Sequence, residues 1–319
     1  MLQTFRAMHI LVAGGAGFIG ANLCRALLQR GADVTVIDNL YTGRRENLAD
    51  LPVRFVEGDI CDRDLLQREF SPERVRFTGV MNLACPASPP AYQAQAVETL
   101  LTGSMGTANT LEIARAHGAR YLLTSTSEIY GEPAVHPQTE DYRGNVNPVG
   151  PRSMYDEAKR FSEAITVAYA KQYEVDTSIV RIFNTYGPFM RPDDGRVITN
   201  FLNQALYGTP LTIYGDGTQT RSFCFVSDLV AGLIAMFESK ERGPVNLGNP
   251  QEVAIRDLVQ RVEEVTGKKC QITYKPLPGD DPTRRCPDIT KARNLLGWQP
   301  VVPLSQGLQT TWEWLSRPL

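Results

Sequence analysis

The sequence predicts an α/β fold built on a parallel, doubly wound sheet, and two observations support this prediction. Short apolar runs alternate with helical patterns through the first half of the chain, and a glycine-rich turn joins the first run to the first helical pattern. Such alternation is typical of right-handed β–α–β units, whose strands lie parallel in one sheet. The 319 residues, 42% of them hydrophobic, suffice for one large domain or two moderate ones.

The elements follow one another in chain order. Each expected strand is a short run rich in aliphatic or β-branched residues, and each expected helix spaces its apolar residues three or four apart, as Leu23, Ala26 and Leu27 are spaced. The order is strand 9–13, helix 21–30, strand 33–37, strand 53–56, helix 65–70, strand 79–83, helix 97–117, strand 120–125, helix 153–172 and strand 177–181.

Composition excludes several classes of function. The net charge of -2 provides no basic field for nucleic acid or a membrane surface. No apolar run approaches the length of a membrane span, and the first one leads directly into the glycine turn rather than resembling a signal peptide, so we expect a cytoplasmic protein. Six scattered cysteines without CxxC spacing and three unpaired histidines predict reduced thiols and no metal site.

The glycine turn predicts a dinucleotide site. Gly14 would make the tight turn, Gly17 would admit the pyrophosphate and Gly20 would let helix and strand pack closely. Asp38 ends the next strand, where a carboxylate binds the adenosine ribose; its charge favours NAD over NADP. The alternative for Asp38 is a helix N-cap. The expected cofactor contacts are Gly14, Gly17, Phe18, Ile19, Gly20, Asp38, Asn39, Asp59, Ile60, Leu83, Ala84, Tyr155 and Lys159.

Tyr155 and Lys159 form a candidate proton-transfer pair. Their spacing places both on one face of a helix. A free tyrosine has a pKa of about 10. A nearby ammonium and the positive nicotinamide favour the phenolate, which could accept a proton from a substrate hydroxyl. The pair follows a strand that ends in hydroxyl residues 124–127 and Glu128, where ligands bind in parallel sheets; a locally hydrogen-bonded turn is the alternative for that run.

The second half of the chain is less regular and richer in turns. We expect a Rossmann-type NAD-binding domain over residues 1–182, to which residues 223–245 return. Residues 183–222 and 246–319 would form a smaller C-terminal α/β lobe that binds the substrate.

Taken together, the glycine turn, the STSE run and the YxxxK pair resemble the extended short-chain dehydrogenase/reductase family. Longer segments resemble the UDP-glucuronate decarboxylases, or UDP-xylose synthases, within it. These segments span nearly the whole chain and comprise residues 82–92, 131–160, 181–197, 214–230 and 280–298.

The resemblance implies a role for each matched residue. Tyr155 would take the proton of the C4 hydroxyl, Lys159 would orient the ribose, and Thr126 would bind the C4 oxygen. Glu128 and Arg221 would lie near the glucuronate carboxylate. Asn184 and Arg285 would contact the UDP phosphates. The alternative for Arg221 and Arg285 is that they make surface salt bridges. The implied catalytic residues are Tyr155, Lys159, Thr126, Glu128 and Arg221, and the implied UDP-sugar contacts are Ser88, Pro89, Tyr92, Ser127, Asn184, Arg221 and Arg285.

The implied reaction converts UDP-glucuronate to UDP-xylose with bound NAD, through oxidation at C4, loss of CO₂ and re-reduction. The chain departs from the family pattern at three places. Ala158 stands where glycine is most frequent, Met154 where cysteine or a small residue is usual, and Gly103-Ser104 where an Asn-Thr pair is usual.

Three other functions stay open. One is a UDP-glucuronate 4-epimerase, which shares the C4 ketone; another is a decarboxylase that releases the UDP-4-keto-pentose; the third is a nucleotide-sensing protein without catalysis. Glu128 favours decarboxylation over epimerisation, and intact Thr126, Tyr155 and Lys159 favour an enzyme. By the same resemblance, helices 97–117 and 153–172 would form a homodimer interface.

Overall fold

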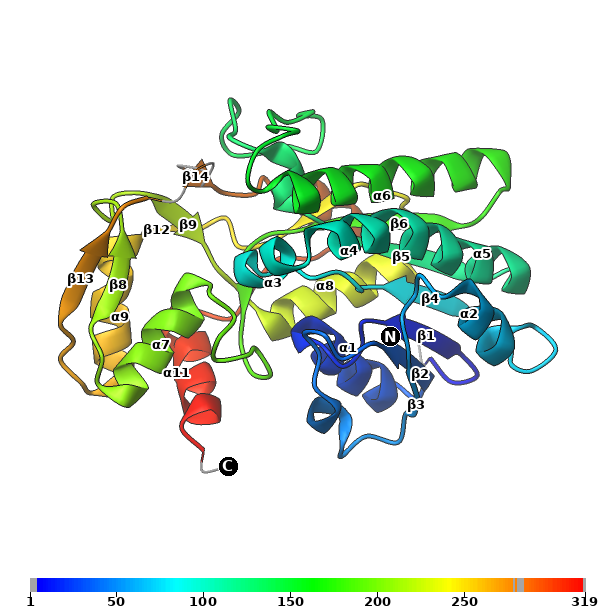
Figure 1. The fold of residues 1–319 in the computed structure, drawn as a ribbon, viewed down its shortest axis with the longest axis horizontal. Helices are drawn as coiled ribbons and strands as arrows, with labels where there is room; N and C mark the ends of the chain where they lie inside the picture. Colours follow the sequence, from blue (N-terminus) through cyan, green and yellow to red (C-terminus); the bar gives the residue numbers. More distant parts are fainter. Residues whose placement is uncertain (1–4, 278, 280–283, 318–319) are drawn as a thin grey trace.

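In a computed structural model, which describes residues 5–277, 279 and 284–317, strands from residues 9–182 and 245–247 form one parallel sheet (Figure 1). Its spatial order is β11-β6-β5-β4-β1-β2-β3, and every adjacent pair is parallel. This confirms the predicted doubly wound fold. The strands are β1 (His9–Ala13), β2 (Asp33–Asp38), β3 (Arg54–Glu57), β4 (Gly79–Asn82), β5 (Arg120–Thr126), β6 (Thr177–Ile182) and β11 (Val245–Leu247).

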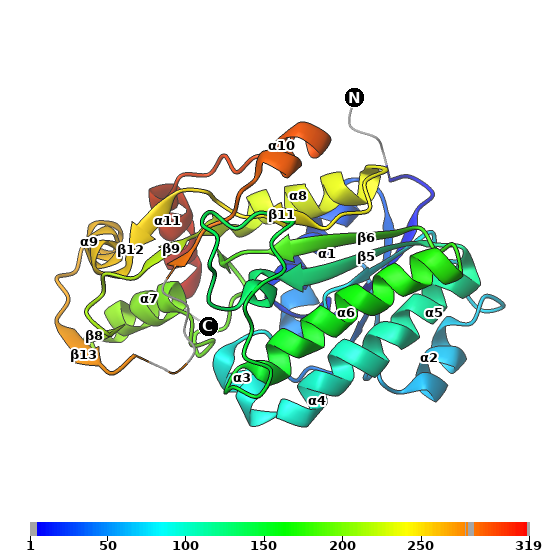
Figure 2. The ribbon, with the colours of Figure 1, turned by 90° about the horizontal axis from the view of Figure 1, so that it is seen from above.

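Helices cover both faces of this sheet (Figures 1 and 2). One face is covered by α2 (Arg63–Phe70), α4 (Ala96–Leu101), α5 (Thr107–His117) and α6 (Ser153–Gln172), and the other by α1 (Phe18–Gln29) and α8 (Val226–Glu238). The strand order reverses between β1 and β4. Ligands bind at such switch points, at the carboxyl ends of the strands.

The second half of the chain builds a smaller α/β lobe at one end of the sheet (Figure 1). Its helices are α7 (Val197–Tyr207), α9 (Ile255–Thr266) and α11 (Leu304–Leu315), and α10 (Thr290–Leu296) lies beside β11. Its short strands pair as β8 (Leu211–Tyr214) with β13 (Ile272–Lys275), β7 (Thr185–Tyr186) with β10 (Cys224–Phe225), and β9 (Thr220–Ser222) with both β12 (Glu252–Ala254) and β14 (Arg284–Arg285). Residues 280–283 of the segment matched at 280–298 lie outside the described residues.

The expected helix over residues 97–117 runs without a gap through α4, the π-helical turn η2 (Thr102–Gly106) and α5. The π-helical turn lies where Gly103 packs against α6: a Cβ on Gly103 would come within 2.6 Å of the Cβ of Ala158. Two of the departures from the family pattern are therefore in contact, and both residues are small where the two helices cross.

Two further findings concern the chain as a whole. All six cysteines are unpaired, and Cys24, Cys224 and Cys286 are buried. Over the described residues, every helix is too short or too polar to cross a bilayer.

Candidate active site

A cavity of about 860 Å³ lies at the carboxyl ends of the parallel strands. The residues that follow β1, β2, β3, β4, β5 and β6 all contribute to its wall, together with residues of the smaller lobe. Every site residue expected from the sequence lines this one cavity, including those from distant parts of the chain such as Tyr92, Asn184 and Arg285. The expected cofactor and substrate residues therefore share a single site.

The glycine turn leaves no room for larger side chains. A Cβ on Gly20 would lie 2.2 Å from the carbonyl oxygen of Gly14, and a Cβ on Gly14 would lie 2.8 Å from the backbone nitrogen of Ala84. Gly17 is the N-cap of α1, and the start of this helix, residues 17–20, lines the cavity. A helix start of this kind binds pyrophosphate, and these residues fit a dinucleotide.

Asp38 ends β2 at the edge of the cavity, as expected for a ribose ligand. Its carboxylate accepts hydrogen bonds from the backbone N–H of Ala16 at 3.0 Å and of Leu40 at 2.9 Å. Burial raises the pKa of Asp38, and the amide hydrogen bonds oppose that rise. Two other expected cofactor residues bond to each other, since the side-chain amide of Asn39 donates to Asp59 at 2.8 Å.

Tyr155 lies buried against the ring of Tyr92 from α3 (Pro89–Ala94). The two rings are stacked at 5.2 Å between centroids with 8° between their planes. Burial raises the pKa of Tyr155 above its usual range, and a hydrogen bond with Thr126 opposes the rise. The expected lowering of the tyrosine pKa is thus absent from the protein alone, because burial outweighs the nearby positive charges.

Lys159 lies one turn further along α6, on the same side as Tyr155. Its ammonium donates a hydrogen bond to the carbonyl oxygen of Thr124 at 2.9 Å and is 6.0 Å from the centroid of the Tyr155 ring. Thr124 is near the end of β5, so this bond joins α6 to the strand that carries Thr126.

Glu128 is held among arginines in η3 (Ser127–Tyr130), directly after β5. It accepts a hydrogen bond from Arg152 at 2.6 Å, and the guanidinium of Arg285 lies 3.4 Å away. Burial opposes ionisation of Glu128, but the charges of Arg285, Arg152 and Arg221 outweigh it and lower the pKa of Glu128 to about 2. Glu128 is therefore a carboxylate at neutral pH, held among three arginines.

Arg285 lies buried beside η3, at the wall of the cavity. It is almost completely buried, and its guanidinium donates to the carbonyl oxygen of Ser127 at 2.7 Å as well as pairing with Glu128. β14 brings it alongside Arg221 of β9. Contact with the UDP phosphates stays a prediction for Arg285 and for Asn184, which also lines the cavity.

The sequence did not single out Arg152, Arg196 or Asp156 as site residues. Arg152 precedes Tyr155 by three residues, a spacing that places both on one side of a helix start and could have indicated it. Arg196 lines the cavity and is bonded to Asp194 by two hydrogen bonds of 2.5 and 2.8 Å. Asp156 is buried behind Glu128, a position that sequence periodicity does not reveal.

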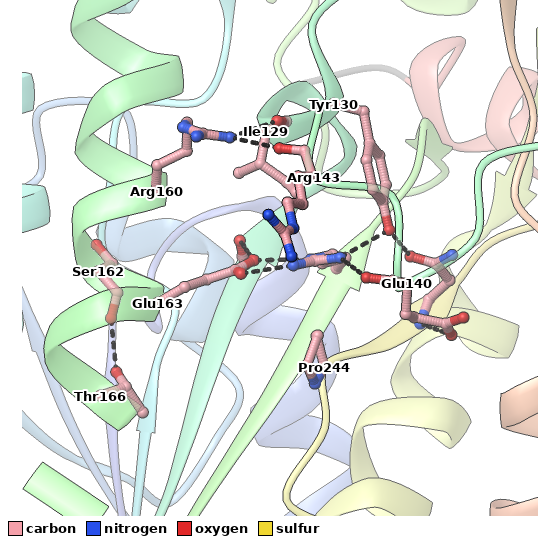
Figure 3. Close-up of polar contacts among 12 residues, drawn as sticks. Ile129, Tyr130, Glu140, Arg143, Arg160, Ser162, Glu163, Thr166 and Pro244 are labelled. Atoms are coloured by element: carbon pink, nitrogen blue, oxygen red, sulfur yellow. Dashed lines mark hydrogen bonds and ion pairs between the residues drawn. The ribbon is translucent and has the colours of Figure 1, made fainter. Parts of the chain in front are cut away.

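A buried ion pair supports this site from behind (Figure 3). Glu163, two turns after Tyr155 on α6, accepts hydrogen bonds from Arg181 of β6 at 2.9 and 2.8 Å and from Ser125 at 2.6 Å. Arg181 also donates to the hydroxyl of Tyr130 at 3.0 Å, and that hydroxyl donates to Asn246 at 2.8 Å. The network connects α6, β5, β6, η3 and β11.

The chain was compared with known proteins. The model of the NAD dependent epimerase/dehydratase family matches residues 10–248. The chain belongs to this family. Its relatives include UDP-glucuronic acid decarboxylase 1 of Danio rerio, 47% identical over 311 residues that cover 98% of this chain and 73% of the relative. UDP-glucuronic acid decarboxylase 4 of Arabidopsis thaliana is 48% identical over 95% of this chain and 67% of its own length.

Solved structures of the epimerase/dehydratase family share the fold. The UDP-glucose 4-epimerase of Thermotoga maritima superposes with a TM-score of 0.91 at 31% identity, covering 97% of this chain and 98% of the other. The UDP-glucuronic acid 4-epimerase of Bacillus cereus, in complex with UDP-glucuronic acid and NAD, gives 0.83 at 30% identity, covering 97% and 99%. The predicted resemblance, the enzyme class and the cofactor NAD are confirmed.

Proposed function

We propose that this protein is a UDP-glucuronate decarboxylase that uses bound NAD to produce UDP-xylose and CO₂. The observation that supports it best is the buried group of Glu128, Arg152 and Arg285 beside Tyr155. Its arginines suit a sugar that carries a carboxylate, because arginine binds carboxylate oxygens with two parallel hydrogen bonds. The higher identity to decarboxylases than to the epimerases of known structure favours the same reading.

The residues that would hold NAD are those of the glycine turn, with Asp38 at the adenosine ribose and Lys159 at the nicotinamide ribose. When bound, NAD supplies reversible hydride transfer at the sugar C4, with no net consumption. Tyr155 removes the proton of the C4 hydroxyl, and Thr126 binds the C4 oxygen. Because burial keeps Tyr155 protonated in the protein alone, the positive cofactor has to favour its ionised form.

Loss of CO₂ depends on the ketone at C4. A carboxylate β to a ketone can leave as CO₂, because the electrons of the broken C–C bond pass into the enolate of C4 and C5. C5 then takes up a proton, and the carbon skeleton is that of xylose. The arginines beside Glu128 orient the carboxylate before it leaves, and Tyr155 returns its proton to the C4 oxygen at the end.

The function is tested by incubating the NAD-loaded protein with UDP-glucuronate and following CO₂, NADH absorbance and product mass. We expect CO₂ release, a product lighter by one CO₂ and no lasting NADH. A new isomer of unchanged mass would contradict decarboxylation in favour of 4-epimerisation. Lasting NADH with a UDP-4-keto-pentose would indicate that the intermediate is released.

We also infer that two copies of the chain pair through α4, η2 and α6. These elements lie side by side (Figure 2). They carry exposed apolar side chains. The residues concerned are between 40% and 64% exposed and comprise Val97, Leu100, Leu101, Met105, Phe161 and Val167. A cluster of exposed apolar side chains is typical of an interface between proteins.

The dimer predicts a mass by light scattering of twice that of the chain. Replacing both Met105 and Phe161 by Glu should yield the mass of one chain, because charges in a buried apolar interface are unfavourable. Tyr207→Glu is the matched control, since Tyr207 is 75% exposed on α7. A wild-type mass of one chain would contradict the dimer.

The proposed function also assigns a ligand to each part of the chain. Residues 183–222 and 246–319 would bind the UDP-sugar, while residues 1–182 and 223–245 bind NAD. Both parts contribute residues to the cavity, as this division requires. A cytoplasmic location stays a prediction from the sequence.

A further inference from the structure

Asp156 is a buried carboxyl group that the proposed mechanism does not use. It follows Tyr155 in the first turn of α6 and is 6% exposed. Its Oδ1 atom has no hydrogen-bond partner among the described residues. Asp156 is not one of the described residues that line the cavity, so it lies behind the site rather than in it. Burying a carboxylate without donors is costly, and a group in this position favours its neutral form.

The charged groups that face Asp156 come from three parts of the fold. Glu128 comes from η3, Arg285 from β14, and Arg152 and Glu157 from the start of α6. Burial and, next, the charge of Glu128 raise the pKa of Asp156 to about 7, while the two arginines oppose the rise. Both protonation states of Asp156 are therefore populated at neutral pH.

A bound sugar carboxylate changes this balance. Glu128 remains ionised, because its arginine neighbours hold its pKa at about 2. A carboxylate that binds to the same arginines adds a negative charge near Asp156. It also compensates the arginine charges that had favoured the ionised form of Asp156. Like charges nearby disfavour ionisation, so the ligand acts on Asp156 although the two do not touch.

We propose that Asp156 takes up a proton from solvent when the carboxylate of the nucleotide sugar binds beside Glu128, and releases it when that carboxylate has left as CO₂. Asp156 thus acts through its neighbours and does not touch the ligand: its proton adjusts the net charge of the group that it forms with Arg152, Arg285 and Glu128. The proposal rests on the proposed function, because it requires a ligand with a carboxylate in this cavity. The proton on Asp156 is distinct from the one that C5 gains in the reaction.

Proton uptake by Asp156 makes the affinity for the ligand depend on pH. Binding raises the pKa of Asp156, so the complex holds more protons than the free protein. Affinity is therefore highest below the pKa of the free protein and falls as pH rises toward the pKa of the complex. Each unit by which the pKa rises on binding weakens affinity by about tenfold across that interval. A ligand without the carboxylate leaves the pKa of Asp156 unchanged and shows no such dependence.

The test measures binding of UDP-glucuronate to the NAD-loaded Tyr155→Phe protein, in which turnover is stopped. Calorimetry in two buffers of different ionisation enthalpy gives the number of protons taken up. We expect uptake of a fraction of one proton near neutral pH and affinity about tenfold weaker at high pH than at low pH. UDP-xylose, which lacks the carboxylate, should bind without proton uptake.

Two variants in the same background identify the group that is protonated. Asp156→Asn should abolish both the uptake and the pH dependence, whereas Glu264→Gln, which removes an exposed acid of α9, should leave them unchanged. Equal uptake in the Asp156→Asn protein would overturn the proposal. If that variant does not fold, infrared spectra of protein labelled at its aspartate carboxyls provide a second test. No gain of protonated aspartate on ligand binding would also overturn the proposal.

Failure of the proposed function is separable from failure of this proposal. Binding with proton uptake by Asp156 but without CO₂ release from the wild-type protein would contradict the decarboxylase alone. CO₂ release with unchanged uptake in Asp156→Asn would contradict the role of Asp156 alone. If UDP-glucuronate did not bind at all, both would be wrong.

Discussion

Replacing Tyr155 by Phe should lower decarboxylation of UDP-glucuronate by about a thousandfold, a typical contribution of general acid–base catalysis. The substitution removes one hydroxyl from a side chain that is buried beneath the ring of Tyr92. Ring stacking and the fold around α6 should persist, and NAD should still bind, because Lys159 retains its bond to the carbonyl of Thr124. Rates of CO₂ release, with NAD content measured after gel filtration, check both parts.

Tyr169→Phe is the matched control, since it removes a hydroxyl from the same helix. Tyr169 lies outside the described wall of the cavity, and its hydroxyl donates to Glu112 at 2.7 Å. Its turnover should equal that of the wild type. Substantial turnover by Tyr155→Phe would remove Tyr155 from the mechanism, and loss of NAD together with activity would indicate a role in binding.

Replacing Glu163 by Ala should lower the free energy of unfolding by about 3–5 kcal/mol, as expected when one partner of a buried ion pair is removed. Arg181 would keep its charge in a buried position and lose both hydrogen bonds to the carboxylate. Ser125 would lose its acceptor as well. Chemical denaturation followed by circular dichroism measures the change.

Glu157→Ala provides the comparison on the same helix. Glu157 pairs with Arg160 at 3.7 Å on the surface, where such pairs contribute about 0–1 kcal/mol. Replacing Glu163 and Arg181 together by Leu and Met should restore part of the stability, because no uncompensated charge stays buried. A loss for Glu163→Ala no larger than that for Glu157→Ala would contradict the role of the network in Figure 3.

Periodicity and short motifs predict the sheet, the glycine turn and the Tyr155/Lys159 pair, because each depends on residues close together in the chain. The position of Glu128 after β5 follows from the same local pattern. The partners of Glu128 do not: Arg285 is 157 residues away and reaches Glu128 only through the pairing of β14 with β9. A contact of this kind depends on the whole fold.

The π-helical turn η2 and the pKa of Tyr155 could not be predicted for a related reason. η2 forms where Gly103 meets Ala158, and nothing in residues 97–117 alone identifies α6 as the neighbour. The pKa of Tyr155 rises because the ring is enclosed by Tyr92 and other groups, and burial is a property of the packed protein. Sequence spacing indicated the nearby lysine but not the burial of the Tyr155 ring.

Tyr155, Lys159 and Glu163 are spaced four residues apart along α6, so one face of one helix carries the proton-transfer group, the lysine beside it and the buried ion pair. Each residue of an α-helix advances the side chains by about 100° around its axis. An insertion or deletion between residues 155 and 163 would therefore turn the reacting end away from the cavity while the other end stayed anchored to β6. Over these two turns, α6 can vary in its outward residues but not in its length.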